Sequence, residues 1–433
     1  MIYDDSRQTQ FIYCEKPSSM KVLVLSQYYP PEVGATQTRV HHFSSRLAAA
    51  GHDVSVVAEM PNHPKGVVFE GYRRKLVARG REDGIDVVRV WVYTSSRKSL
   101  ARRLAFYATY MVNAVLAALL VVRRRPDVIF ASSPPLPVLC AAYAVSRLTR
   151  RPFVGDIRDI WPAIGVALGE VRGNRAVRLA QRLERFLYRT ASSITVVTEG
   201  FVDHVVAQGA DPEKVTLLPN GTLPELFSPD RTHPTLREGL GEPRFVVGFF
   251  GNHGIAQGLP AVVDAASLLR DRKDIHFLFV GEGPVKEELI AKARTEMLSN
   301  VTFREQVPIE EVAEQIAACD MALVPLRRLE TLETFVPSKL FDFLACATPV
   351  LLMVDGEARR ILEKCGGGVY VEPEDAQGLA GTVRRMADEP GQLAEMGRAG
   401  REYVLTHHSR RQQADRLETL LRQVAEGGSA LRE

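Results

Sequence analysis

The segment FVPSKLFDFLACATPVLL carries an ammonium group and a carboxylate at the start of a predicted helix. Ser338 and Lys339 open the helix, and Asp342 follows within its first turn. A lysine supplies a charge suited to a pyrophosphate, and a carboxylate accepts hydrogen bonds from both hydroxyls of a ribose. A surface lysine, or an aspartate in the first turn of a helix, would explain either residue alone. The combination favours a nucleotide-binding helix.

Glycine-rich loops follow several predicted strands. In FFGNHGIAQGL the residues Gly251 and Gly254 come just before a helix, and Gly281 and Gly283 occupy the corresponding place in VGEGP. Small residues let backbone N–H groups approach a phosphate, so both loops are candidates for phosphate binding.

The first strand of the chain ends in a similar loop. In SQYYPPEVGATQTRV, Gly34 and Ala35 precede a helix that opens at Thr38, where a helix N-terminus favours an anion. A tight turn between strand and helix would explain the same residues.

Charged residues alternate around a tryptophan in RPFVGDIRDIWP. Asp156, Arg158, Asp159 and Trp161 follow a predicted strand. Unpaired charges are costly in a core, so we expect these residues at the edge of a ligand cleft. The alternative is that Asp159 caps a helix and Trp161 packs in the core.

The composition is that of a globular protein with room for two domains. Of 433 residues, 45% are hydrophobic and 25% are charged. Residues 1–200 contain 29 Lys and Arg against 16 Asp and Glu, and the rest of the chain is acidic. A basic first half fits an acidic partner, such as anionic lipid, a pyrophosphate or nucleic acid, or is simply a solvated surface. The five scattered cysteines indicate a reducing compartment and argue against zinc or a disulfide framework.

One apolar stretch, Leu104 to Val122, has about the minimum length for a membrane span. Arginines flank it on both sides, which gives no orientation bias, and a buried-strand pattern, RPDVIFASSP, follows directly. We therefore expect a helix that lies on a membrane or packs on a sheet.

Short Val/Ile-rich runs alternate with helical patterns in both halves of the chain, which predicts two doubly wound parallel sheets. We expect an arm over 1–19 without a signal peptide, an N-terminal Rossmann-like domain over 20–230, a C-terminal one over 231–408, and an amphipathic helix over 409–433 that returns toward the first domain. The Pro-rich stretch from Leu223 to Arg244 reads as a linker. Neither G-x-G-x-x-G after the first strand nor a P-loop is present, which argues against a dehydrogenase and a P-loop enzyme.

The motifs together resemble glycosyltransferase family 4. They are PNG with F-x-P after it, VGEGP, VTFREQVPIEEV, AACDMALVPL and PSKLFDFLACATPV, and they extend over nearly the whole chain. The resemblance implies the α/β GT-B fold, with two Rossmann-like domains facing a cleft, and a retaining reaction. SQYYPPEVGA, MPNHPKG and RDIWP are similar to bacterial transferases that build O-antigen, capsule or colanic-acid repeats, including the N-acetyl-L-fucosamine transferase type.

The resemblance also implies roles for individual residues. The glutamate of the family that binds the donor ribose corresponds to Asp342, and its companion eight positions earlier corresponds to Thr334. The basic pair of the phosphate loop falls near Asn252 and on Gln257, so Lys339 is the candidate replacement. The family histidine falls on Asp159.

The expected site divides into three groups. The candidate catalytic residues are Asp159, Lys339 and Thr334. The candidate donor-binding residues are Gly34, Ala35, Gly251, Asn252, Gly254, Gln257, Gly281, Gly283, Ser338, Lys339, Leu340 and Asp342. The candidate acceptor-binding residues are His63, Arg158 and Trp161. Since no D-x-D motif is present, we expect no metal and no other cofactor.

The sequence therefore predicts transfer of a sugar from a nucleotide-sugar, with UDP as the expected nucleotide, to a polyprenyl-diphosphate-linked acceptor in surface polysaccharide synthesis. We expect a cytoplasmic protein on the inner face of the plasma membrane, bound to its anionic surface, without a nucleic-acid partner. The alternatives are a nucleotide-sugar 2-epimerase, which leaves the apolar stretch unexplained, and a noncatalytic nucleotide-binding subunit, which Thr334 and Gln257 would suit.

Overall fold

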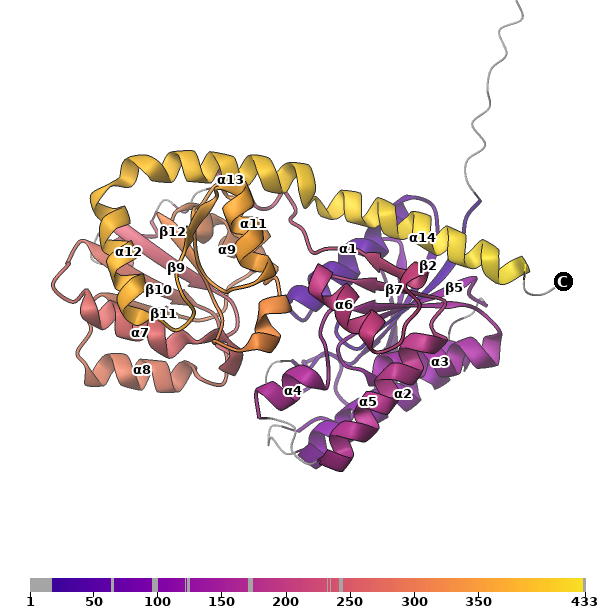
Figure 1. Cartoon of the computed structure of the whole chain (residues 1–433). Helices are drawn as coiled ribbons and strands as arrows, with labels where there is room; N and C mark the ends of the chain where they lie inside the picture. Colours follow the sequence, from indigo (N-terminus) through magenta and orange to yellow (C-terminus); the bar gives the residue numbers. More distant parts are fainter. Residues whose placement is uncertain are drawn as a thin grey trace, which may run out of the picture.

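Two α/β domains, each with helices on both faces of a sheet, make up the computed structural model (Figure 1). It describes residues 18–63, 66–95, 100–120, 122, 125–169, 174–231, 233, 235–240 and 244–430. The prediction of two doubly wound sheets is confirmed. Residues 1–17 of the expected arm lie outside the described residues.

The N-terminal sheet has the order β3-β4-β2-β1-β5-β6-β7-β8, and β3 alone of these strands runs antiparallel to its neighbour. Its strands are β1 (Lys21–Ser26), β2 (Asp53–Glu59), β3 (Val77–Glu82), β4 (Ile85–Val90), β5 (Val128–Ser133), β6 (Phe153–Ile157), β7 (Ser193–Val196) and β8 (Val215–Leu217). The helices between them are α1 (Ala35–Ala49), α2 (Leu100–Leu120), α3 (Pro137–Thr149), α4 (Ala163–Ala167), α5 (Asn174–Thr190) and α6 (Glu199–Ala207). The strand order reverses between β1 and β5, and this is where open α/β sheets bind ligands.

The C-terminal sheet is entirely parallel in its described strands, with the order β11-β10-β9-β12-β13-β14. Its strands are β9 (Phe245–Phe250), β10 (Ile275–Val280), β11 (Val301–Arg304), β12 (Met321–Pro325), β13 (Val350–Met353) and β14 (Gly368–Tyr370). The helices are α7 (Leu259–Leu268), α8 (Lys286–Thr295), α9 (Ile309–Ala317), α10 (Lys339–Ala345), α11 (Glu357–Cys365), α12 (Ala376–Asp388), α13 (Leu393–His407) and α14 (Arg410–Ala430). β9 and β10 are buried along their whole length because helices cover both faces.

The chain passes between the domains twice, and the two passes touch. The N–H of Thr222 donates to the carbonyl of His408 at 2.9 Å, and the N–H of Arg410 donates to the carbonyl of Thr222 at 3.1 Å. The chain first crosses at Thr222, which comes before the domain boundary that the sequence predicted after residue 230. Phe227 and Leu236, which the sequence placed near or in a linker, are instead buried in the C-terminal core. Local Pro-rich composition gave no sign of this burial.

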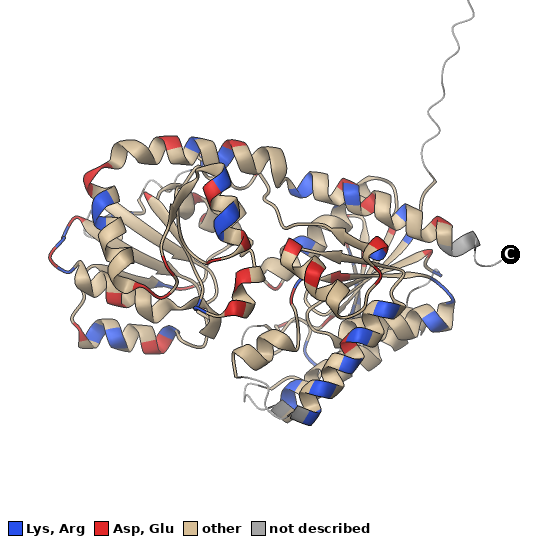
Figure 2. Ribbon diagram, viewed as in Figure 1, with Lys and Arg blue, Asp and Glu red and all other residues tan. Residues whose placement is uncertain are grey.

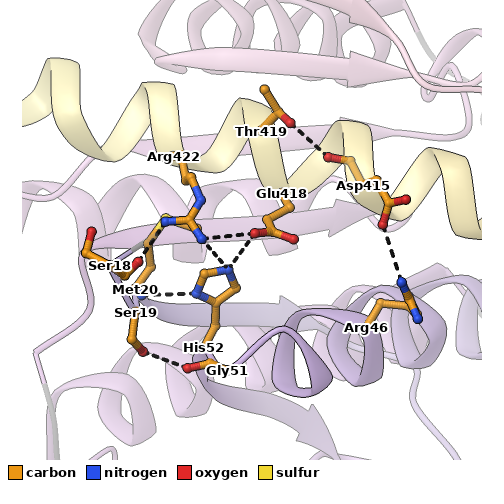
Figure 3. Close-up of polar contacts among 10 residues, drawn as sticks. All are labelled: Ser18, Ser19, Met20, Arg46, Gly51, His52, Asp415, Glu418, Thr419 and Arg422. Carbon is orange, nitrogen blue, oxygen red and sulfur yellow. Dashed lines mark hydrogen bonds and ion pairs between the residues drawn. The ribbon is translucent and has the colours of Figure 1, made fainter. Parts of the chain in front are cut away.

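Helix α14 packs on the N-terminal domain (Figure 1), where Ala414, Leu417 and Leu421 join the core over α1. Polar contacts also join the C-terminal part of α14 to the N-terminal domain (Figure 3). Nδ1 of His52 accepts from the N–H of Met20, so Nε2 donates to the Glu418 carboxylate at 3.1 Å. Arg422 also pairs with Glu418, at 3.0 Å. Helix α14 therefore belongs with the domain that contains β1.

A buried ion-pair network lies at the carboxyl ends of the N-terminal strands. Asp156, at the end of β6, is fully buried and pairs with Arg39 at 3.1 Å and Arg158 at 3.5 Å. It also accepts hydrogen bonds from the hydroxyls of Ser132 and Thr195. Burial raises the pKa of Asp156, but the two guanidinium groups and these hydrogen bonds outweigh it and hold that pKa below its ordinary value.

Replacement of Asp156 by Asn should strongly destabilise the fold. Arg39 and Arg158 are almost fully buried and would lose their counter-charge. Removal of one partner from a buried pair costs about 3 kcal/mol or more. Urea unfolding measures the loss. The matched control is Asp271→Asn, whose partner Arg384 is exposed, and its effect should stay within about 0.5 kcal/mol. Equal losses in both variants would contradict the role of the network.

Candidate active site

The start of α1 and the start of α10 meet across the two domains. Ala35 and Ser338 line one small cavity, together with Asn220 and Arg410 from the crossover. The carbonyl of Gly34 accepts from both the N–H and the hydroxyl of Thr38, which anchors the first turn of α1. The tertiary structure therefore brings together the loop after β1 and the helix that carries Lys339.

Two glycine loops interlock beside this helix. The N–H of Gly251 donates to Val280, and the N–H of His253 donates to Glu282. Gly281 has φ +141°, and a Cβ on it would collide with the backbone of Gly251. Only glycine permits this approach. Asn252 is exposed between the loops. Its side chain lies where a Cβ on Gly254 or on Gly283 would collide with it.

Lys339 extends its side chain from α10 to these loops. Its Nζ lies 4.1 Å from the ring centroid of Phe249 and 3.4 Å from Oε1 of Gln257. A Cβ at Gly251 would come within 3.1 Å of the same Nζ. Within the described part of the chain, no carboxylate forms an ion pair with Lys339. The side chain is half-buried, and burial lowers the pKa of Lys339 to about 7.

Asp342, one turn further along α10, points to the crossover. Its two carboxylate oxygens lie 3.3 and 3.4 Å from a guanidinium nitrogen of Arg410. Burial raises the pKa of Asp342 to about 6, although the nearby positive charge of Arg410 opposes the shift. Nε of Arg410 donates to the carbonyl of Gly221 at 2.6 Å. The carboxylate is therefore held in place by the segment that connects the domains.

A second set of contacts joins the two domains at the start of α6. The carboxylate of Glu357 accepts from the N–H groups of Glu199 and Gly200, both at 3.1 Å, at the start of α6. Phe201 and Phe335 pack edge to face at 5.0 Å between ring centroids. Thr198 caps the same helix end from within the domain. An acidic side chain from one domain thus satisfies the helix N-terminus of the other.

Comparison with known proteins agrees with this architecture. A "Glycosyl transferase 4-like domain" family model matches residues 34–221, and a "Glycosyl transferases group 1" model matches residues 244–389. The chain belongs to the glycosyltransferases. The transferase is 27% identical to the putative colanic acid biosynthesis glycosyl transferase WcaI of Escherichia coli, over 84% of this chain and 92% of that one. It is also 27% identical to the probable glycosyltransferase WbjE of Pseudomonas aeruginosa, over 61% and 66% of the two chains.

Solved structures share the GT-B fold. Sucrose-phosphate synthase of Thermosynechococcus elongatus superposes with a TM-score of 0.75 at 18% identity, covering 94% of this chain and 100% of the other. HepE of Anabaena, in complex with UDP-glucose, gives 0.67 at 18% identity, with coverage of 95% and 100%.

Several expected site residues of the glycosyltransferase lie elsewhere than predicted. The side chain of Leu340 is fully buried in the C-terminal core, so only its backbone could reach a donor. Arg158 donates to the hydroxyls of Ser132 and Thr36 and pairs with Asp156, so its guanidinium is used inside the domain. That Arg158 binds an acceptor stays a prediction, although these partners already use two of its nitrogens. Charges were expected to avoid a core, but here they enter it as pairs.

The other candidates lie around the cleft. Thr334 ends the 3₁₀ turn Glu330–Thr334, and its side chain packs where a Cβ on Gly200 would collide. Asp159 is half-buried near Arg158, and Trp161 packs against the cores of both domains. His63 lies after β2 on the rim of the N-terminal domain, 5.9 Å from the ring of Tyr28. Catalytic roles for Thr334 and Asp159 stay predictions.

Sequence reasoning missed Arg410 and Glu357. Nothing near either residue in the sequence signals its partner, since Arg410 and Asp342 are 68 residues apart and Glu357 and Gly200 are 157 apart. For metals, no group of three or more His, Cys, Asp or Glu side chains that could hold an ion occurs among the described residues.

Replacement of Asp342 by Asn should raise the stability of the unliganded transferase in a pH-dependent way. The carboxyl ionises near its ordinary value of 3.8 when unfolded and at about 6 when folded. The charged form is therefore disfavoured by folding, and the penalty grows between those pH values and is constant above about pH 6. We expect a gain of roughly 1–3 kcal/mol at pH 8 and almost none at pH 4, measured by urea unfolding. If Asp342→Asn were less stable than the wild-type protein at pH 8, the predicted penalty of the charged carboxylate would be contradicted.

Proposed function

We propose that this glycosyltransferase moves a sugar from a nucleotide-sugar, with UDP as the nucleotide, to a polyprenyl-diphosphate-linked acceptor at the inner face of the plasma membrane. The observation that carries the donor half is Lys339, a half-buried ammonium position without a carboxylate partner among the described residues, between two interlocked glycine loops. The acceptor half rests on an exposed apolar surface of the N-terminal domain.

The donor diphosphate would lie over the two glycine loops. Lys339 and the amides near Gly251 and Gly281 would stabilise the negative charge that grows on the departing diphosphate, which is the main catalytic effect that this site offers. Asp342 would accept hydrogen bonds from the ribose, and Arg410 keeps its carboxylate oriented. Neither role calls for a metal. Retention of anomeric configuration follows from the family resemblance.

The relatives support this substrate class. WcaI carries the name of a colanic acid biosynthesis transferase, and HepE binds UDP-glucose in its crystal structure. We therefore propose assembly of a surface polysaccharide as the process in which this chain takes part.

Removal of the Lys339 charge should weaken binding of the diphosphate and not of the nucleoside. We expect Lys339→Ala to cost about 1.5–3 kcal/mol for UDP and little for uridine, measured by calorimetry. The pKa of about 7 also predicts that UDP binding at pH 8 takes up a proton, which two buffers of different ionisation enthalpy would reveal. Lys339→Arg should bind UDP without proton uptake.

The matched control is Asp342→Ala, which should weaken UDP and uridine alike because the lost contact is to the ribose. Wild-type protein is first tested with UDP-, GDP- and dTDP-sugars and mass detection of products. Equal losses for UDP and uridine in Lys339→Ala would remove Lys339 from the phosphate site. A clear preference for GDP or dTDP would correct the nucleotide.

Helix α2 has one face in the core and one face in solvent. Tyr110, Ala114, Ala117 and Ala118 are buried against the sheet and α3. On the opposite face Leu104, Val112 and Leu116 are 54%, 52% and 48% exposed, and Leu120 continues the stripe. Among the described helices, α2 is the one long and apolar enough to cross a membrane. Because it packs on the sheet, we propose that it lies on the bilayer with its exposed stripe inserted.

Helix α5 adds charge to the same domain. Figure 2 shows basic residues along this helix, and all of them are arginines. Its exposed arginines are Arg175, Arg178, Arg182, Arg185 and Arg189. They are interleaved with exposed Leu179, Leu183 and Phe186. Basic residues near an anionic surface contribute about 1 kcal/mol each. Apolar and basic groups together suit reversible, salt-sensitive attachment to anionic lipid.

Replacement of the stripe should release the enzyme from lipid. We expect Leu104→Ser, Val112→Ser and Leu116→Ser together to reduce binding to phosphatidylglycerol vesicles and activity on a lipid-linked acceptor, while activity on a short soluble analogue changes little. The matched control is Leu268→Ser with Met297→Ser, two exposed apolar residues of the C-terminal domain. Vesicle flotation measures binding. If wild-type protein ignores these vesicles at low salt, the membrane proposal fails.

A further inference from the structure

A second hollow lies in the N-terminal domain, away from the glycine loops. It has a volume of about 560 Å³ and is wide open to solvent. Arg73, Arg102, Tyr93, Thr94 and Ser95 line it, together with residues 66–68. None of the described residues that line it is acidic. Two guanidinium groups and three hydroxyls around one hollow are the chemistry that binds phosphate groups.

The hollow is built on anchored elements. Thr109 of α2 accepts from the N–H of Tyr93 at 3.0 Å, and Asn113 donates to the carbonyl of Trp91 at 2.8 Å. Nε of Arg73 donates to the carbonyl of Val68 at 3.2 Å, which ties this arginine to the opposite wall. The residues after β4 and the middle of α2 are therefore joined at fixed positions.

The position of the hollow relates it to the cleft. β4, β2 and β1 are parallel neighbours, so their carboxyl ends lie along one edge of the sheet. The end of β4 stands two strand spacings, about 10 Å, from the end of β1, where the segment that leads to Gly34 begins. Tyr28 and His63, which follow β1 and β2, have their ring centroids 5.9 Å apart. The spacing between β1 and β4 suits an acceptor whose sugar is in the cleft and whose diphosphate is further along the edge.

The apolar stripe and the hollow share helix α2. Arg102 lines the hollow, and exposed Leu104, Val112 and Leu116 form the stripe further along the same helix. A ligand with a diphosphate head and an apolar chain would meet arginines first and then a lipid-facing surface. Free diphosphate would use only the first part of this arrangement.

We propose that this hollow is the subsite for the diphosphate of the lipid-linked acceptor, with Arg73 and Arg102 on its phosphates. The inference rests on the proposed function. It adds the place where the diphosphate of the acceptor binds and the residues that bind it. It assigns the two diphosphates of the reaction to different domains, that of the donor to Lys339 and that of the acceptor to Arg73 and Arg102.

The test measures binding of hexyl diphosphate, hexyl phosphate, hexanol and inorganic pyrophosphate by calorimetry in the presence of saturating UDP, which occupies the donor site. We expect hexyl diphosphate to bind best, and Arg73→Gln with Arg102→Gln to weaken it at least about tenfold without loss of UDP affinity. Arg74→Gln is the matched control, since Arg74 is exposed and outside the lining. Circular dichroism checks the fold of each variant.

The outcomes separate the two proposals. Unchanged binding of hexyl diphosphate in the double variant overturns the subsite, and so does pyrophosphate that binds as tightly as hexyl diphosphate. Activity of the wild-type enzyme on a lipid-linked acceptor, combined with either result, leaves the proposed function standing. Transfer only to soluble acceptors overturns the proposed function, whatever hexyl diphosphate does.

Discussion

A line of buried and half-buried charges at the back of the cleft holds the two domains in register. Asp156 holds Arg39, and Arg39 donates to the carbonyls of Leu218 and Pro219 just before the chain leaves the N-terminal domain. On the other side Arg410 bonds the same crossover at Gly221 and pairs with Asp342. Arg39 of the N-terminal domain and Arg410 at the second crossover therefore both bond the first crossover, and each arginine also pairs with a carboxylate, Asp156 or Asp342. The geometry of every site between the domains depends on these contacts.

This arrangement ties the proposed donor site to the hinge. Asp342 has a folded-state pKa of about 6, so its charge at neutral pH is not favoured by the fold itself. Lys339 likewise has its pKa lowered to about 7 by burial, with no ion-pair partner in the described chain. The charged forms of both groups reduce the free energy of unfolding of the unliganded protein. Residues that bind a ligand commonly destabilise the fold in this way. Two neighbouring groups on α10 thus have their charged forms disfavoured, and a bound nucleotide would favour the charged form of each.

The N-terminal domain shows a different use of surface. α2 buries Tyr110 and three alanines against the sheet, so the helix is part of the core, yet its outer face is apolar instead of polar. An outer helix face in water would ordinarily carry polar side chains. The stripe, the arginines of α5 and the hollow with Arg73 and Arg102 all belong to this one domain. The proposed division of labour follows: the C-terminal domain holds a soluble nucleotide, and the N-terminal domain meets a lipid.

The sequence by itself determined the features that depend on neighbours along the chain. Alternating strands and helices predicted two parallel sheets, and local spacing placed Gly251, Gly281, Lys339 and Asp342 at the carboxyl ends of strands or at a helix start. These follow from periodicity and from the few backbone conformations that glycine loops allow.

The tertiary structure alone decided what each charge does. Arg158 looked like a cleft residue but pairs with Asp156, and Leu340 looked like a donor contact but is buried. Asp342 meets Arg410, Gly200 meets Thr334 and Glu357, and Phe227 joins the second core instead of a linker. Such partners lie tens to hundreds of residues apart, and local composition does not encode which distant side chain will satisfy a buried charge or an open helix end. That choice is made by packing, because a buried ion or a free N–H must find a partner only after the domains have come together.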